Sequence, residues 1–160
     1  MKPSSAPILD RAGAARYAAE LRAAGRRLVF TNGVFDLVHP GHVRYLRAAA
    51  ALGDALMVGL NTDASVRRNK GENRPITPEL ERAELIAALE CVAAVTMFDE
   101  DTPARIVQEV LPAVLVKGAD WPEDQIVGRD TVEAGGGRVV RIAVEEGYST
   151  SALLEKIRAR

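Results

Sequence analysis

Short apolar runs alternate along this chain with longer stretches in which apolar residues recur every three or four positions. The short runs predict buried strands over 28–31, 55–60, 92–98, 114–116 and 138–142. The longer stretches predict helices over 10–24, 41–52, 78–89, 103–110 and 151–159. Alternating strands and helices are typical of a parallel sheet wrapped by helices. We therefore expect a single α/β domain of the Rossmann-like, doubly wound kind, with a five-stranded, mostly parallel sheet and helices on both faces.

Two segments lie outside these predicted elements. Residues 1–7 contain two prolines and two serines and are predicted to be a flexible tail. Residues 62–77 are polar and are predicted to be a long loop, with Thr77 as the N-cap of the helix that follows. Loops of this length inside a compact domain are usually functional or disordered. The basic residues of the loop are therefore candidates for anion binding: Arg67, Arg68, Lys70 and Arg74.

Composition narrows the class of protein. The 160 residues are 48% hydrophobic and 27% charged, which is ordinary for one soluble globular domain. The net charge of −1 gives no indication of nucleic acid or a membrane surface as a partner. Cys91 is the only cysteine, which excludes an internal disulfide and fits a reducing compartment. No apolar stretch approaches the length of a membrane span, and residues 1–9 lack a signal core, so we expect a cytoplasmic protein.

The two histidines of the chain, His39 and His42, lie three residues apart after the first apolar strand. Pro40 between them suits the first position of a helix, because its missing N–H would be unpaired there. His39 is then expected at the N-cap, with His42 in the first turn. The backbone N–H groups of Gly41 and His42 and the helix dipole would favour an anion at this point. Gly33 and Gly41 lack a Cβ and would let a ligand approach the backbone.

Two other interpretations of the histidine pair stay open. Histidines at the start of a helix can be solvated caps with no ligand, but the order of strand, glycine turn and proline-capped helix favours a phosphate site. Two histidines can also ligate zinc. The sequence supplies only Cys91 and no HExxH or CxxC pattern for the remaining ligands, which counts against zinc.

The His39-Pro40-Gly41-His42 segment resembles the HxGH signature of a nucleotidyltransferase superfamily. Further stretches resemble its D-glycero-β-D-manno-heptose 1-phosphate adenylyltransferases, at 58–66, 70–71, 74–75, 81–82, 99–103, 115–121 and 146–151. The resemblance covers roughly residues 26–158, so residues 1–25 are expected to form the tail and first helix, and 26–160 the nucleotidyltransferase domain. In many bacteria this domain follows a sugar kinase, whereas this chain resembles the stand-alone form.

The resemblance implies transfer of AMP from ATP to heptose 1-phosphate, giving ADP-heptose and pyrophosphate for the lipopolysaccharide core. It implies catalytic roles for His39, His42 and Lys70. Nucleotide binding is expected from Thr31, Asn32, Gly33, Phe35, Gly41, Lys117, Gly118, Asp120, Ser149, Thr150 and Ser151. Acceptor binding is expected from Asp36, Asn61, Asp63, Arg74 and Trp121. Mg²⁺ is expected to arrive with ATP, held mainly by phosphate oxygens and water, and a homodimer is expected from the superfamily.

Several of these residues have a plainer interpretation. Trp121 could stack on a base or a sugar, or it could anchor packing. Ser149 could touch triphosphate or simply cap the last helix, while Asp36 could orient a histidine or a magnesium-bound water, or only form a turn. Ser151 stands where a threonine is commoner, but it keeps the hydroxyl.

The reaction follows from the chemistry of the acceptor. A sugar 1-phosphate has a second pKa of about 6 and is mostly dianionic at neutral pH. It can attack the α-phosphorus of ATP without a general base, so the enzyme has to position the reactants and stabilise charge. Two alternatives remain, cytidylyl transfer to a polyol or amino-alcohol phosphate and a non-catalytic nucleotide sensor. Residues 143–146 lack the arginine found in related cytidylyltransferases, which argues against that branch.

Overall fold

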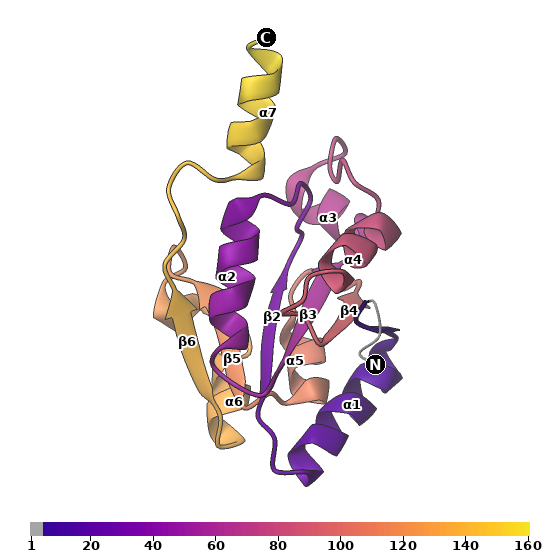
Figure 1. Cartoon of the computed structure of the whole chain (residues 1–160), viewed down its shortest axis with the longest axis vertical. Coiled ribbons are helices and arrows are strands. Elements are labelled where there is room, and N and C mark those ends of the chain that lie inside the picture. The colour runs from indigo at the N-terminus through magenta and orange to yellow at the C-terminus, as the bar shows by residue number, and fades with distance from the viewer. Residues whose placement is uncertain (1–4) are drawn as a thin grey trace.

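The computed structural model describes residues 5–160, in which six parallel strands form one sheet. The strand order across the sheet is β1-β4-β3-β2-β5-β6 (Figure 1). The strands are β1 (Ile8–Leu9), β2 (Leu28–Gly33), β3 (Ala55–Asn61), β4 (Ala94–Phe98), β5 (Val114–Gly118) and β6 (Arg138–Ile142). The α/β, Rossmann-like prediction is confirmed, but the prediction of five strands is wrong. The missed strand, β1, has two residues and pairs with β4, and it is too short to show any apolar alternation.

Helices cover both faces of the sheet. They are α1 (Arg11–Ala23), α2 (Pro40–Ala50), α3 (Asp63–Lys70), α4 (Glu79–Ala87), α5 (Ala104–Val110), the 3₁₀ turn η1 (Glu123–Gln125), α6 (Arg129–Ala134) and α7 (Thr150–Arg158). The predicted strands and the five predicted helices are present, with ends that differ by at most two residues, as helix and strand boundaries commonly do. In Figure 1, α2 crosses the front of the sheet and α7 extends from the body at the upper end. In the described part, no helix is both long and apolar enough to cross a membrane.

The prediction of a loop over 62–77 is wrong, because α3 occupies its first half. Thr62 caps this helix, since its Oγ1 accepts the N–H of Ser65 at 3.2 Å. Helix α3 buries only Ser65 and Val66, so it has too few apolar positions to show helical periodicity. Thr77 is not the N-cap of α4, which begins at Glu79 after Pro78. Helix α6 was missed for the same reason, because it buries only one residue, Val132.

Alternate residues of each strand enter two separate cores, one on each face of the sheet. Phe30 and Met57 point to the face covered by α1, α5 and α6, while Val29 and Val58 point to the face covered by α2 and α4. Strand β3 is buried over its full length, as expected for a central strand of a parallel sheet. This packing fixes the strands rigidly, so the turns at their C-terminal ends have a firm base.

The start of the chain is bound to the body from residue 6 onward. The N–H of Ala6 donates to the carbonyl of Ala87 at 2.8 Å, and the N–H of Val95 donates to the carbonyl of Pro7 at 2.9 Å. Helix α1 contributes Ala14 to the core. The predicted flexible tail is therefore wrong for residues 6 and 7, and its residues 1–4 lie outside the described part of the chain.

Candidate active site

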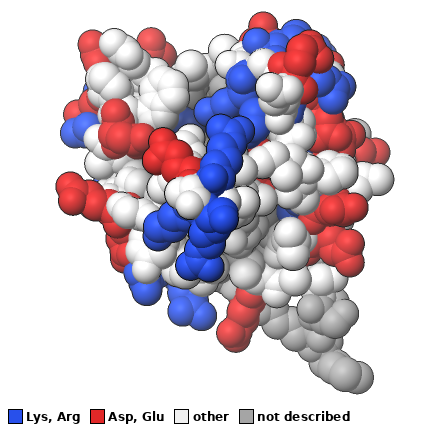
Figure 2. All heavy atoms as spheres, turned by 90° about the horizontal axis from the view of Figure 1, so that it is seen from above, with Lys and Arg blue, Asp and Glu red and all other residues white. Residues whose placement is uncertain are grey.

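A cavity of about 870 Å³ lies over the C-terminal ends of β2, β3, β5 and β6, where ligands bind in open α/β sheets. Figure 2 shows the molecule from this end, with a band of Lys and Arg side chains across the surface. The cavity has a size suited to a small-molecule ligand. Among the predicted site residues it is lined by His39, His42, Lys70, Asn32, Gly33, Phe35, Gly41, Lys117, Gly118, Asp120, Ser149, Thr150, Ser151, Asp36, Asn61, Arg74 and Trp121.

The histidine pair lies at the start of α2, as predicted, with His39 at the N-cap and Pro40 at the first helical position. The two rings stack with centroids 3.7 Å apart and an angle of 21° between their planes. The His39 N–H donates to Nδ1 of His42 at 3.4 Å. Since Nδ1 is the acceptor, the proton of a neutral His42 belongs on Nε2. The backbone N–H of His42 donates to the carbonyl of His39 at 3.0 Å, so the prediction that this group is free for an anion is wrong.

Both histidines are neutral at pH 7. Burial, together with the adjacent His39 ring, lowers the pKa of His42 to about 4. Burial also lowers the pKa of His39 below its usual value. Nδ1 of His39 is buried and has no hydrogen-bond partner among the residues described. A buried polar atom without a partner is costly, so a ligand that supplied one would be bound favourably here.

Two glycines keep the space around the histidines open for neighbouring rings. A Cβ on Gly41 would lie 2.8 Å from Cβ of Tyr148 and 3.0 Å from Cε1 of His39. Gly41 is therefore required by side-chain packing as well as by the predicted approach of a ligand. A Cβ on Gly33 would lie 2.8 Å from the Phe35 ring, whose residue has a left-handed φ of 50°.

Tyr148 also lines the cavity, and sequence reasoning did not assign it a role. Its ring stacks on His39 at 5.9 Å, and the guanidinium of Arg44 lies 5.5 Å from the centre of the Tyr148 ring. Arg44 also pairs with Glu145, which anchors the segment before α7 to α2. Only the Gly147-Tyr148 match to the family could have drawn attention to this residue.

Asp36 acts on the loop before α4. Its carboxylate is buried and accepts the Nε–H of Arg74 at 2.8 Å and the N–H groups of Ile76 and Thr77 at 2.9 and 2.8 Å. Burial alone would raise the pKa of Asp36, but these hydrogen bonds and the Arg74 charge hold it below its usual value. Neither histidine is among these donors. The arrangement fixes Arg74 at the edge of the cavity, where its charge can reach a phosphate.

Thr31 and Asp63 do not line the cavity, although both were predicted site residues. Thr31 is buried under it, where its hydroxyl donates to the carbonyl of Val116 at 3.0 Å and lies 2.9 Å from the Tyr45 hydroxyl. Asp63 forms an ion pair with Arg82 at 2.8 Å. Both side chains are bonded to protein groups in this structure, and the contacts with nucleotide and acceptor predicted for them stay predictions.

Lys117 in β5 and Asp120 and Trp121 just after it also line the cavity. The Lys117 ammonium lies 5.4 Å from the centre of the Trp121 ring. Burial lowers the pKa of Lys117, and the charge of Asp120 opposes that shift. Trp121 is 48% exposed and lines the cavity, so it does not anchor the core and can stack on a ligand.

The remaining predicted residues come from the starts and ends of helices and strands. Lys70 is the last residue of α3, and Asn61 lies at the end of β3, where its side chain donates to the Ser65 hydroxyl at 3.0 Å. Ser149 caps α7, because its Oγ accepts the N–H of Ala152 at 2.9 Å. Ser149 lines the cavity as well, so both interpretations of this residue are compatible.

The side chains near the histidine pair decide which metal ions the site could hold. The described residues contain no group of three His, Cys, Asp or Glu side chains that could hold a metal ion. A zinc site built on the histidine pair would need such a group. A magnesium ion coordinated mainly by phosphate oxygens and water needs none, and this set of residues fits it.

The sequence is similar to those of known proteins. The family model described as cytidylyltransferase-like matches residues 30–156. The bifunctional protein HldE of Citrifermentans bemidjiense is 56% identical over 133 residues, which are 83% of this chain and 27% of that protein. HldE of Geobacter metallireducens is 50% identical over 154 residues, 96% of this chain and 31% of that protein. The chain thus spans less than a third of the length of these relatives.

A solved structure is similar as well. The crystal structure of the lipopolysaccharide core biosynthesis protein from Thermoplasma volcanium matches with a TM-score of 0.65 and 33% identity, over 76% of this chain and all of that chain. Together with the family model, which covers most of the sequence, this match settles the family. The chain belongs to the cytidylyltransferase-like family of nucleotidyltransferases.

Proposed function

We propose that this chain transfers AMP from ATP to D-glycero-β-D-manno-heptose 1-phosphate, releasing pyrophosphate and forming ADP-heptose. One observation carries the proposal: two neutral, stacked histidines at the start of α2 face the same cavity as Lys70 and Arg74. The identity of 50–56% with HldE proteins supports the choice of reaction. The similarity to the lipopolysaccharide core biosynthesis protein of Thermoplasma volcanium supports a place in the synthesis of that core.

The nucleophile is the acceptor phosphate itself. Its second pKa of about 6 leaves it mostly dianionic at pH 7, so no side chain has to remove a proton from it. One of its oxygens attacks the α-phosphorus of ATP in line, and the bond from that phosphorus to the bridging oxygen of pyrophosphate breaks. Protonated histidines are not required, which agrees with the low pKa of His42.

Catalysis by this chain would then consist of placing donors around the transferring phosphorus. Nε2–H of His42 is a neutral donor, held by the hydrogen bond at Nδ1, and we assign it to the α-phosphate. Lys70 would balance the charge that builds on the leaving pyrophosphate. Arg74, held by Asp36, would bind a phosphate of the acceptor, and Trp121 would stack on its sugar face or on the base. Mg²⁺ bound to the triphosphate would neutralise part of its charge.

The test is pyrophosphate release by purified protein with Mg²⁺. ATP and CTP are each combined with the β-heptose 1-phosphate, other hexose 1-phosphates and glycerol 3-phosphate. Release with ATP and the heptose phosphate alone is the expected result. Release with CTP and a polyol phosphate would support the mechanism but contradict the proposed substrates. No pyrophosphate release from folded protein that binds ATP would favour the sensor alternative.

The cellular setting and assembly state belong to the same proposal. We place the reaction in the cytoplasm, because it consumes ATP. The homodimer stays a prediction, and sedimentation of the purified protein across a concentration series would test it.

A further inference from the structure

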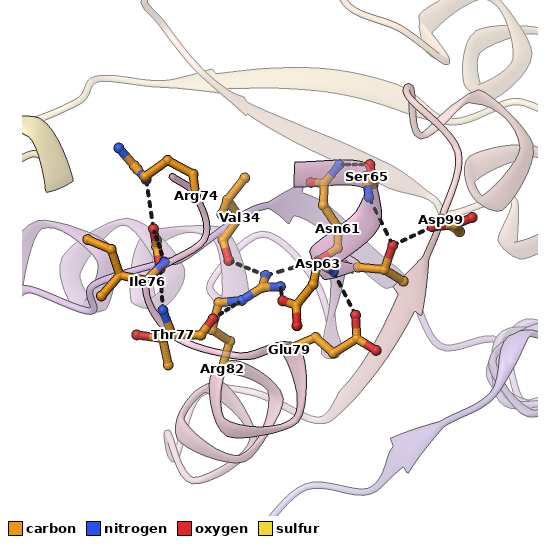
Figure 3. A network of polar contacts seen from close by, with 12 residues as sticks. Val34, Asn61, Asp63, Ser65, Arg74, Ile76, Thr77, Glu79, Arg82 and Asp99 are labelled. Carbon is orange, nitrogen blue, oxygen red and sulfur yellow. Dashed lines mark hydrogen bonds and ion pairs between the residues drawn. The ribbon is translucent and has the colours of Figure 1, made fainter. Parts of the chain in front are cut away.

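Arg82 is the largest fully buried side chain of the molecule's described part, with none of its surface exposed. It lies on α4, although an arginine on a helix ordinarily faces solvent. All three of its guanidinium nitrogens are bonded, as Figure 3 shows. They donate to the carbonyls of Thr77, Val34 and Asn61 at 2.8, 2.8 and 2.9 Å, and to the Asp63 carboxylate at 2.8 Å.

The acceptors belong to three turns around the cavity. Val34 lies in the turn between β2 and the histidines, Asn61 ends β3, and Thr77 ends the loop before α4. Asp36 joins the first and third of these turns a second time, through its bonds to Ile76 and Thr77. The guanidinium therefore links the turn that carries the histidines to the loop that carries Arg74. A lysine offers one compact ammonium and cannot reach four acceptors in this fork-like arrangement.

Helix α3 is attached to the same guanidinium through its first residue. The Asp63 carboxylate pairs with Arg82, and the Asp63 N–H donates to the Glu79 carboxylate at 2.6 Å. Helix α4 thus holds the start of α3 at two points. Helix α3 has eight residues and ends at Lys70, which lines the cavity. A movement at Asp63 would be carried along this short rigid helix to the Lys70 ammonium.

We propose that Arg82 and Asp63 are positioning residues that set the place of Lys70 relative to the two histidines. The proposal rests on the proposed function, and it gives Asp63 a role that does not involve contact with substrate. A misplacement of about 1 Å at a reacting centre can cost about a hundredfold in rate. Loss of the Asp63 carboxylate should therefore lower kcat far more than it raises KM for the sugar phosphate.

The first test is a double-mutant cycle of Asp63→Ala and Lys70→Ala. Asp63→Ala alone should lower kcat by roughly tenfold to a hundredfold. In the Lys70→Ala background the same change should lower kcat by less than about twofold, because there is no ammonium left to misplace. If the two effects multiply, or if KM for the sugar phosphate accounts for the loss, the positioning role is wrong. Asp63→Asn keeps an acceptor for Arg82 and should retain most of the activity.

Glu109→Ala is the matched control. Glu109 pairs with Arg11 at 2.9 Å, its side chain is 28% exposed against 27% for Asp63, and it does not line the cavity. Arg11 is 32% exposed and keeps its pair with Glu100, so the loss of Glu109 should reduce thermal stability less than the loss of Asp63 and leave kcat unchanged. An equal fall of kcat in Glu109→Ala would show that lost stability, and not placement, explains the Asp63 variant.

Hydrogen exchange separates this proposal from the proposed function. Amides of residues 63–70 should exchange faster in Asp63→Ala than in the wild type, and at the wild-type rate in Glu109→Ala. This result is expected even if the wild type transfers no nucleotide to any acceptor. Such a lack of transfer would contradict only the proposed function. Unchanged exchange over 63–70 would overturn the link between Arg82 and α3.

Discussion

The pKa of His42 offers a sharp test of the site, because the chain has only two histidines and their NMR signals are readily assigned. Burial and the neighbouring His39 ring lower the pKa of His42 from 6.5 to about 4. We expect the His42 ring to titrate near pH 4 in the folded protein. The proton of the neutral ring should lie on Nε2, because Nδ1 accepts the His39 N–H.

The low pKa has a consequence for stability. The unfolded chain binds a proton at His42 near pH 6.5, whereas the folded protein does so only near pH 4. Below pH 6.5, protonation of His42 therefore stabilises the unfolded state relative to the folded state. The free energy of unfolding falls until both states are protonated below pH 4. The difference between the two pKa values corresponds to a loss of about 3 kcal/mol in total, of which about 2 kcal/mol is lost by pH 5.

The assay compares the wild type with His42→Gln, which cannot titrate in this range. Free energies of unfolding in urea are measured at pH 8 and pH 5 for both proteins. The wild type should lose about 2 kcal/mol more than the variant between these two pH values. Equal losses, or a His42 titration midpoint near 6.5, would refute the conclusion that burial and the His39 ring lower the pKa of His42 in the folded protein.

Three further predictions concern single side chains. His42→Ala should lower kcat by about a hundredfold in the pyrophosphate assay with its fold intact by circular dichroism, since one preorganised donor is lost; near-normal turnover would remove His42 from the α-phosphate. Lys70→Ala should lower kcat while KM for the sugar phosphate stays within about twofold; a large rise in that KM would move Lys70 to the acceptor. Asp36→Asn should cost about 3 kcal/mol of unfolding free energy in urea, because it leaves the Arg74 charge without its buried partner; an unchanged midpoint would contradict that role.

The parts of the fold that could be predicted from sequence are those with a strong local signal. Strand β3 is a continuous apolar run buried along its whole length, and α2 begins at a proline and carries its apolar residues on one face. Strand β1, with two residues, and helix α3, with two buried positions, have no such signal. Their structure depends on contacts with α4 and β4, which are distant in sequence, so local pattern could not reveal them.

The histidine site was predictable because its parts are adjacent in sequence. The buried Arg82 that holds the surrounding turns was not predictable. His39, Pro40 and His42 fall within one turn, so strand, turn and helix start could be placed together. Arg82 acts on groups up to 48 residues away along the chain. In a sequence an arginine within a helix indicates an exposed position, and only the fold shows that this one has its four acceptors under the cavity.

The basic residues of 62–77 also show that a local sequence pattern does not reveal which side chains face the cavity. Their shared interpretation was a loop that binds anions, but a helix turns each successive residue by about 100° and separates them. Arg68 points to the outside and pairs with Asp101 at 2.8 Å, both half-exposed, in a contact that contributes little to stability. Arg74 is fixed by the buried Asp36, and Lys70 lines the cavity at the end of α3. A phosphate in the cavity would therefore meet two of these four cations, Arg74 and Lys70. A different carboxylate positions each of them: Asp36 binds Arg74 directly, and in our proposal Asp63 positions Lys70 through α3.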